Sequence, residues 1–215
     1  MKDNENIVKT GTTTVGIICR DGIILAADRR ATSGYLIAEK RTDKIYNINE
    51  RIAVTMAGTA SDAQLLIKIA QAELRLKLIR TDQEVTVKEA ANLMARLVYN
   101  NVRKFSIIPG ISHFIMAGVD PDKKCCLYDI FADGTISEQR DYVSSGSGSV
   151  MAYGVLETLY KEDMSVDEGV KLAVKCINAA VQRDIASGNG IDVFTVTKEG
   201  AKRVMQKEFN TRIEA

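Results

Sequence analysis

Two apolar segments near the start of the chain place the strongest constraint on its fold. Residues 13–19 (TTVGIIC) and 22–28 (GIILAAD) are apolar almost throughout and do not alternate with polar residues. This pattern is typical of strands that are buried on both faces. Asp21 and Gly22, at the junction of the two segments, favour a tight hairpin. A sheet of this kind needs a covering layer on each side, so the chain is expected to fold in stacked layers.

The elements expected after this hairpin can supply the layers. A second hairpin is predicted at 44–48 and 51–57, a helix over about 61–79, and another helix after a capping box at Thr86–Glu89. The later elements are strands at 112–120, 124–131 and 135–143, a helix from 146–149 to about 160, a helix from the capping box at Ser165–Glu168 to about 186, and strands at 191–198 and 201–208. Strand runs that alternate with helix pairs predict an α+β fold. The specific architecture is a four-layer αββα sandwich of two antiparallel sheets stacked face to face, each covered by a helix pair.

The composition indicates an ordinary globular domain. The chain has 215 residues, 27% of them charged and 46% apolar, with a formal net charge of +1. These values predict one domain and exclude a disordered or membrane-embedded chain. The charges of both signs are interspersed, so no nucleic-acid partner is expected.

The cysteines and the lone histidine indicate no metal or other cofactor. The four cysteines form no CxxC motif, and each lies in an apolar run, where it is expected to be a small buried side chain. A single histidine, His113, adds no ligand spacing. We expect a reducing, cytoplasmic location.

The scarcity of histidine also limits the choice of catalytic base. A serine or cysteine nucleophile of the usual kind would have only His113 as its imidazole partner, and this residue is expected to be a core or rim histidine. A hydroxyl nucleophile can instead use the α-amine that is freed when the peptide before it is cut. The Gly11–Thr12 junction suits this solution, because glycine lets the backbone contort at the cut. On these residues alone, the simpler interpretation is favoured: Thr13 and Thr14 are β-formers of an edge strand.

Four other polar features need an explanation. Asp28 ends an apolar strand, where it can cap the strand or pair with a cation, while Lys44 at a strand start is usually a solvated charge. Asp184 is expected on the apolar stripe of the last helix, near its C-terminus, where burial and the helix dipole both oppose an acid. It therefore needs a specific partner. The run 146–149 (GSGS) is either a flexible turn or a set of amides that faces an anion.

Together these features resemble the catalytic β-subunits of the 20S proteasome, most closely those of the archaeal type, within the N-terminal nucleophile hydrolases. The stretches that carry the resemblance span nearly the whole chain in the family's order: TGTTTVG (10–16), ILAADRRAT (24–32), DKIYNI (43–48), MAGTASDAQ (56–64), SSGSGSVMAYGVLE (144–157), MSVDEGVKLA (164–173) and QRDIASGNGIDV (182–193). One departure is the run 187–190 (SGNG), where the family commonly carries a second glycine at the position of Asn189. We expect a local change of the turn there without loss of the chemistry.

The resemblance implies a set of site residues. Thr12 corresponds to the nucleophile, exposed when a propeptide, residues 1–11, removes itself by cleavage of the Gly11–Thr12 bond and leaves 12–215 as a single catalytic domain. Asp28 and Lys44 match the acid and the lysine that flank the nucleophile. The other matches are Gly58 as the oxyanion amide, Ser147, Asp184 and Ser187 around the terminal threonine, Ala31, Met56 and Ala60 in the first specificity pocket, and Thr32, whose backbone pairs with bound peptide.

The implied activity is that of a threonine endopeptidase that degrades unfolded polypeptides to short peptides. The partners implied are seven copies of the chain in a β-ring, outer rings of α-subunits, and an unfoldase ATPase. A roomy apolar pocket beside Met56 and Ala31 predicts cleavage after hydrophobic residues. Three alternatives remain. A non-catalytic ring subunit would be expected to lack the threonine or the lysine, and an α-subunit would carry a longer N-terminal extension. The third alternative is another hydrolase with an N-terminal threonine.

Overall fold

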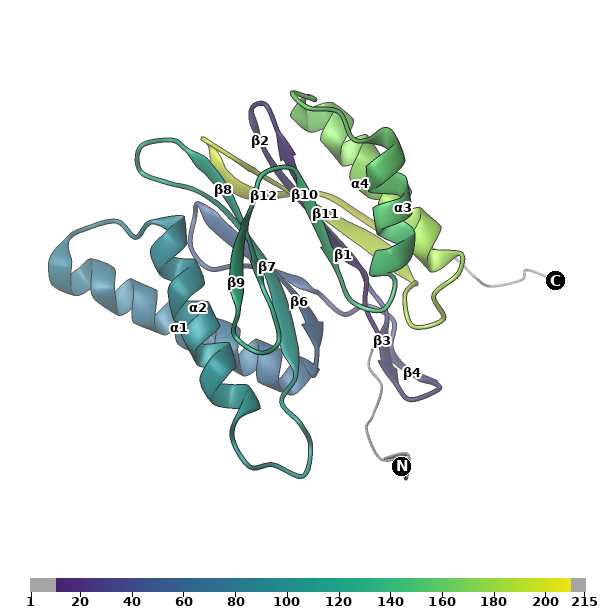
Figure 1. Cartoon of the computed structure of the whole chain (residues 1–215), viewed down its shortest axis with the longest axis horizontal. Coiled ribbons are helices and arrows are strands. Elements are labelled where there is room, and N and C mark those ends of the chain that lie inside the picture. The colour runs from purple at the N-terminus through teal and green to yellow at the C-terminus, as the bar shows by residue number, and fades with distance from the viewer. Residues whose placement is uncertain (1–10, 210–215) are drawn as a thin grey trace.

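The chain forms two stacked antiparallel sheets with a pair of helices on each outer face (Figure 1). A computed structural model of the chain describes residues 11–209. Most of the expected propeptide, residues 1–10, and the last six residues of the expected catalytic domain lie outside the described residues.

The first sheet carries the two apolar segments at its centre. From edge to edge it consists of β10 (Tyr142–Ser145), β1 (Thr14–Cys19), β2 (Gly22–Asp28), β11 (Gly190–Thr197) and β12 (Gly200–Glu208). Every residue of β2 is buried, as its unbroken apolar sequence predicts. The second sheet consists of β5 (Ile45–Asn47), β6 (Ile52–Gly58), β7 (Ser112–Val119), β8 (Cys125–Ile130) and β9 (Ile136–Gln139).

The four helices form two pairs, and two of the helix starts carry the predicted capping boxes. The helices are α1 (Ala60–Thr81), α2 (Val87–Val102), α3 (Ser149–Leu159) and α4 (Val166–Val181). Thr86 and Glu89 cap α2 reciprocally, and Ser165 and Glu168 do the same for α4, so that side chains satisfy amides that have no partner within the helix.

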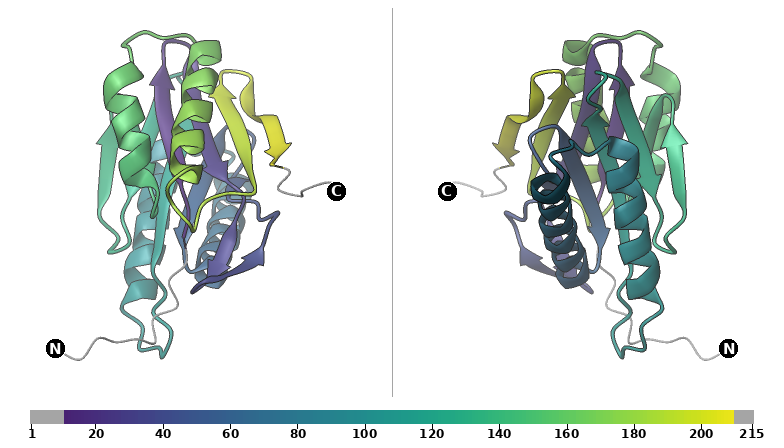
Figure 2. Two further views of the ribbon diagram at one scale, coloured as in Figure 1. Left: turned by 90° about the vertical axis from the view of Figure 1, so that its right-hand side faces the viewer. Right: turned by 90° about the vertical axis from the view of Figure 1, so that its left-hand side faces the viewer.

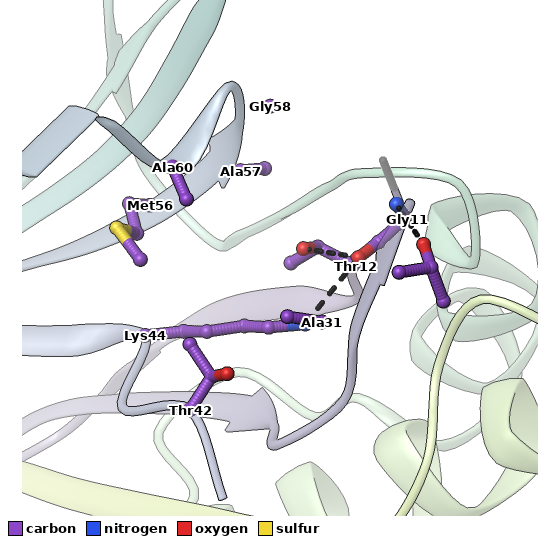
Figure 3. Close-up of a pocket in the computed structure, with 10 residues that line it drawn as sticks. Gly11, Thr12, Ala31, Thr42, Lys44, Met56, Ala57, Gly58 and Ala60 are labelled. Atoms are coloured by element: carbon purple, nitrogen blue, oxygen red, sulfur yellow. Dashed lines mark hydrogen bonds between the residues drawn. The ribbon is translucent and has the colours of Figure 1, made fainter. Parts of the chain in front are cut away.

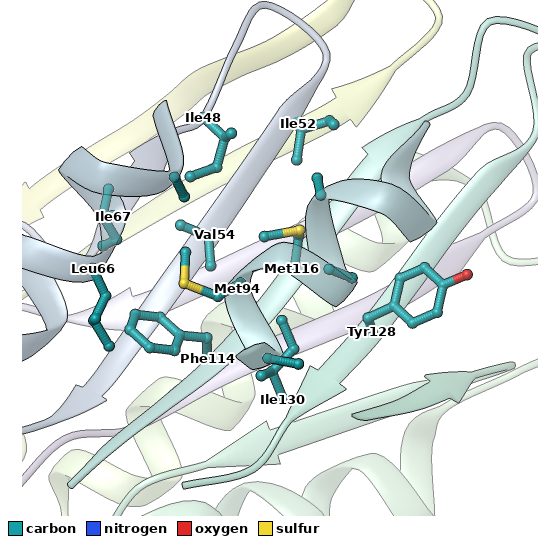
Figure 4. Packing of buried hydrophobic residues seen from close by; sticks show 14 of the residues in the cluster. Ile48, Ile52, Val54, Leu66, Ile67, Met94, Phe114, Met116, Tyr128 and Ile130 are labelled. Atoms are coloured by element: carbon teal, nitrogen blue, oxygen red, sulfur yellow. The ribbon is translucent and has the colours of Figure 1, made fainter. Parts of the chain in front are cut away.

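Three apolar clusters hold the layers together. One lies between α1, α2 and the second sheet and includes Met94, Phe114 and Met116 (Figure 4). Another lies between the first sheet and α3 and α4, which cover that sheet side by side (Figure 2). The third lies between the two sheets and includes Leu25 and Ile115. The three interfaces separate four layers, so the predicted αββα sandwich is confirmed.

The structure differs from the sequence-based expectations in three places. The segment 135–143, predicted as one strand, is two strands: β9 pairs with β8 in the second sheet, and β10 pairs with β1 in the first. An additional hairpin of β3 (Ala31–Ser33) and β4 (Leu36–Glu39) follows β2. The last helix ends at Val181, before the predicted 186, and residues 182–183 form a turn.

The pairing of β1 with β2 determines where the candidate site lies. Thr14 is opposite Ala27, so the start of β1 and the end of β2 lie side by side at one end of the first sheet. In the second sheet the start of β5 pairs with the latter part of β6, with Ile45 opposite Thr55, and the Met56 amide donates to the Lys44 carbonyl. The polar residues singled out in the sequence therefore gather at one end of the sandwich. Among residues 11–209, no helix is long and apolar enough to cross a membrane.

Candidate active site

Thr12 lies directly before β1, buried at this end of the sandwich with 6% of its surface exposed. Its hydroxyl donates to the Gly11 carbonyl oxygen at 2.6 Å. Its amide donates to the Ser147 hydroxyl at 3.2 Å, and its carbonyl oxygen accepts from the Gly148 amide at 3.3 Å. The threonine is thus fixed on both sides by the loop that precedes α3, while its hydroxyl lies against the peptide bond that precedes it.

Asp28, the last residue of β2, is fully buried and accepts four hydrogen bonds. Oδ1 accepts from the Thr13 amide at 2.9 Å and from Lys44 Nζ at 2.8 Å. Oδ2 accepts from the amides of Arg30 and Gly188 at 3.0 and 2.9 Å. The four donors satisfy both carboxylate oxygens and join Asp28 to the segment that carries Thr12.

Lys44 approaches from the second sheet, with 3% of its side chain exposed. Its ammonium pairs with Asp28. It also lies 3.4 Å from the Gly11 carbonyl oxygen, within the group of residues that Figure 3 shows. Burial lowers the pKa of Lys44 below its ordinary value, and the negative charges of Asp28 and Asp184 offset part of this effect. Lys44 is therefore not a solvated edge charge but a buried cation beside the carbonyl that precedes Thr12.

A hydrogen-bonded series of side chains lies on the other side of Thr12. This series, called the hydroxyl row below, consists of Ser147, Asp184, Ser187 and Thr13. Asp184 Oδ2 accepts from the hydroxyls of Ser147 and Ser187, each at 2.6 Å, and the Ser187 hydroxyl lies 2.7 Å from the Thr13 hydroxyl. Asp184 lies in the turn after α4, not on the helix as predicted, and its amide donates to the Ala180 carbonyl. The expectation that it needs a specific partner is confirmed by the two serines.

A pocket opens beside Thr12, with about 360 Å³ of empty space that is open to solvent (Figure 3). The residues that line it are Gly11, Thr12, Ala31, Thr32, Thr42, Lys44, Met56, Ala57, Gly58 and Ala60. They include the four residues expected to contact substrate, Ala31, Thr32, Met56 and Ala60. Met56 and the small alanines leave an apolar hollow, as a subsite for a hydrophobic side chain requires.

Gly58, expected to supply the oxyanion amide, ends β6 at the rim of this pocket. Its φ of +103° lies in a region that residues other than glycine rarely adopt. A Cβ atom at this position would overlap the Ile111 carbonyl oxygen. The backbone therefore requires glycine here.

Sequence reasoning missed several residues that contribute to this end of the sandwich. Thr42 and Ala57 line the pocket, and each is a near neighbour in sequence of a predicted site residue, which is the signal that could have identified them. Arg29 is buried and donates to both carboxylate oxygens of Asp192 at 2.8 Å, while its Nη1 lies 3.3 Å from Asp43 Oδ1. The sequence signal for this network is an arginine directly after a buried aspartate.

His113, the single histidine, lies in β7 and is not one of the residues that line the pocket. Its Nε2 is hydrogen-bonded to Asp129 at 2.5 Å, and its ring lies 5.2 Å from that of Phe131. This position agrees with the expectation of a core or rim histidine. Over the described range 11–209, no three His, Cys, Asp or Glu side chains form a group that could hold a metal ion.

The arrangement combines a hydroxyl, a neighbouring carbonyl, a buried ammonium and an apolar pocket. A hydroxyl held against a carbonyl can attack a carbonyl carbon, and the nearby cation can stabilise the negative charge that forms. The site is therefore suited to acyl transfer.

The comparisons with known proteins identify the family. The family model described as proteasome subunit matches residues 8–196. Among similar curated proteins, a proteasome subunit beta of Ferroglobus placidus is 44% identical over 95% of each chain. Those of Archaeoglobus profundus and Methanothermobacter thermautotrophicus are 44% identical over 94% of this chain and 91% of theirs, and 42% identical over 99% and 98%, respectively. The chain, with its two stacked sheets and the site at one end of them, therefore belongs to the proteasome subunit family.

Proposed function

We propose that the chain is a threonine endopeptidase, the catalytic β-subunit of a proteasome core, with Thr12 as its nucleophile. The observation that carries the proposal is that two sets of polar side chains contact Thr12 and the peptide bond before it. The Asp28–Lys44 pair approaches the Gly11 carbonyl, and Ser147 binds the Thr12 amide. The family relationship supports a protease in general, and these contacts support the choice of residue.

The first step of the proposal is removal of residues 1–11. The Thr12 hydroxyl oxygen attacks the Gly11 carbonyl carbon, and the hydroxyl proton passes to a base. The protonated base then gives the proton to the Thr12 nitrogen as the C–N bond breaks, which leaves the Gly11 acyl group as an ester on the Thr12 oxygen and frees the Thr12 amine. Water then hydrolyses the ester. The short distances from the Gly11 oxygen to the Thr12 hydroxyl, 2.6 Å, and to Lys44 Nζ, 3.4 Å, support this step.

The same hydroxyl then cleaves substrate peptides. The freed α-amine, with an ordinary pKa of about 7.7–8.0, and Lys44, whose pKa burial lowers, are the two groups that can take the hydroxyl proton. The row from Ser147 through Asp184 holds the nitrogen of Thr12 in place. The Gly58 amide stabilises the oxyanion, a contribution worth about 2.7–4 kcal/mol for one donor in comparable sites. Water releases the acyl group.

The pocket supports a preference for hydrophobic residues on the acyl side of the cut. Its lining beside Met56 and Ala31 offers an apolar surface, while Thr32 lies at the edge where an extended peptide can pair. Unfolded polypeptides are the substrates of the proposal, since only an extended chain presents its backbone in this way.

The proposal also includes the assembly and its location. The chain forms seven-membered β-rings that stack against rings of proteasome α-subunits, and an unfoldase ATPase supplies substrate. Cys19, Cys125, Cys126 and Cys176 are all free thiols, which supports a reducing, cytoplasmic location.

The test is the intact mass of the full chain after co-assembly with an archaeal α-subunit, compared with a Thr12→Ala variant. We expect the wild type alone to lose residues 1–11 and to gain peptidase activity. An unprocessed wild-type chain in an assembled particle would refute the catalytic role and favour a structural ring subunit.

A further inference from the structure

A turn joins α4 to β11 (Figure 1). It contains Asn189, whose backbone conformation is uncommon. Asn189 has a φ of +62°, in the left-handed region that asparagine tolerates better than most residues. It is buried, with 8% of its surface exposed. Its side-chain oxygen accepts from Arg30 Nε at 2.7 Å. The side chain therefore has a defined partner, which a glycine at this position would lack.

Arg30 connects this turn to the buried acid of the site. Its amide donates to Asp28 Oδ2 at 3.0 Å, while its Nη1 donates to the Ile185 carbonyl oxygen at 2.7 Å. The guanidinium thus contacts both ends of the turn 185–189. A Cβ atom at Gly188 would also meet the guanidinium, so the two groups are closely packed.

The turn held in this way carries the groups around Thr12. Asp184 directly precedes it, and Ser187 lies within it, hydrogen-bonded to Asp184 and next to Thr13. The Gly188 amide binds Asp28. A displacement of the turn would therefore move the hydroxyl row and one of the four donors on Asp28 together.

We propose that Asn189 is a positioning residue for the threonine site, which acts through Arg30 to hold the turn 184–189 against Asp28. The inference rests on the proposed function, because it concerns the efficiency of the same site.

The charge of Arg30 gives the arrangement a second effect. Three charged side chains act on Lys44: Asp28 at the end of β2, Arg30 two residues later, and Asp184 in the turn after α4. The two carboxylates raise the pKa of Lys44, whereas the guanidinium lowers it. A guanidinium released from Asn189 can move towards solvent, where screening weakens this effect. The pKa of Lys44 would then rise.

The test compares Asn189→Gly with Asn189→Asp in the full chain, co-assembled with an α-subunit. Glycine keeps the backbone conformation and removes the acceptor, whereas aspartate keeps an acceptor for Arg30 Nε. We expect Asn189→Gly to lower kcat for a hydrophobic peptide about tenfold, within the range that small displacements of catalytic groups produce. KM should change little, since Asn189 does not line the pocket. Asn189→Asp should keep kcat at the pH optimum within about twofold, since the acceptor is retained.

The pH profile separates positioning from loss of stability. With Asn189→Gly the acid limb of kcat/KM should move to higher pH, because the pKa of Lys44, one of the two groups that can take the hydroxyl proton, would rise. The matched control is Asp163→Gly, which also has a φ of +62° but lies between α3 and α4 beside the opposite end of β1. This control should keep the wild-type kcat and pH profile.

Two results would overturn the inference. In one, Asn189→Gly keeps the wild-type kcat and acid limb; in the other, Asn189→Asp loses as much activity as Asn189→Gly. A lower melting temperature with unchanged kcat per assembled site would also overturn the inference, because Asn189 would then affect stability alone. Failure of the proposed function looks different, because the wild type would then be inactive or no more active than Thr12→Ala, and both proposals would fall.

Discussion

Replacing Asp28 with asparagine should destabilise the protein strongly, because it removes the charge partner of a buried lysine. The two side chains are 0% and 3% exposed, and 2.8 Å separates Oδ1 from Nζ. In either orientation, the NH2 group of the asparagine would also face backbone amides that are themselves donors. These are the Thr13 amide on one side and the Arg30 and Gly188 amides on the other. Loss of one partner from a buried ion pair costs about 3–5 kcal/mol in free energy of unfolding. In a domain of this size that corresponds to a fall in melting temperature of about 10 °C.

The penalty should depend on pH through Lys44. Burial already lowers the pKa of Lys44 in the folded protein, and removal of the Asp28 charge lowers it further. Between the folded pKa values of the variant and the wild type, the folded variant binds fewer protons. The variant is therefore stabilised relative to the wild type as pH rises through this window, by about 1.4 kcal/mol per pH unit. The penalty of Asp28→Asn should be largest near pH 7 and smaller near pH 9.5.

The assay is denaturant unfolding of the full-length Asp28→Asn and wild-type chains at both pH values. A matched control is Glu84→Gln, which removes the charge partner of Arg51 from an ion pair with 25% and 57% of the side chains exposed. The control should cost less than about 1 kcal/mol, because exposed pairs are weak. A penalty for Asp28→Asn below 1 kcal/mol, or one that does not change with pH, would refute the reasoning.

Two further predictions concern the rim of the pocket and a helix start. Gly58→Ala should lower kcat at least a hundredfold, because the new Cβ would overlap the Ile111 carbonyl and displace the amide that we assign to the oxyanion; peptidase activity within threefold of wild type would contradict this assignment. Thr86→Ala should lower the melting temperature by about 2–4 °C through loss of the α2 capping box, with unchanged peptidase activity. Calorimetry tests the second prediction, and an unaltered transition would show that the cap contributes nothing.

The sequence predicts the layers of the fold well, because their signals are local. Unbroken apolar strands and two capping boxes identify buried sheets and helix starts without knowledge of their neighbours. The hairpin of β3 and β4 was missed, since its strands are three and four residues long and β4 is exposed throughout. The division of 135–143 was missed for another reason: β9 and β10 differ in the sheet they join, and no local pattern records this.

The site shows the same division between local and distant signals. The resemblance to the family identifies Thr12, Asp28 and Lys44, and the structure brings them together. The sequence gives no sign that the guanidinium of Arg30 reaches Asn189, 159 positions away. Asp184 was assigned to the wrong kind of element, because the apolar period of α4 continues to Val181 and does not mark the turn that follows.

The two sheets contribute different halves of the candidate site. Thr12 and Asp28 lie at one end of the first sheet, before β1 and at the end of β2. Lys44 and Gly58 lie before β5 and at the end of β6, in the second sheet. Neither sheet alone holds a nucleophile, a cation and a pocket, so the groups meet only when the apolar surfaces between the sheets have closed. In a chain that is still folding, the proposed threonine site is therefore incomplete. The hydroxyl, the cation and the pocket come together only when the two sheets have packed against each other.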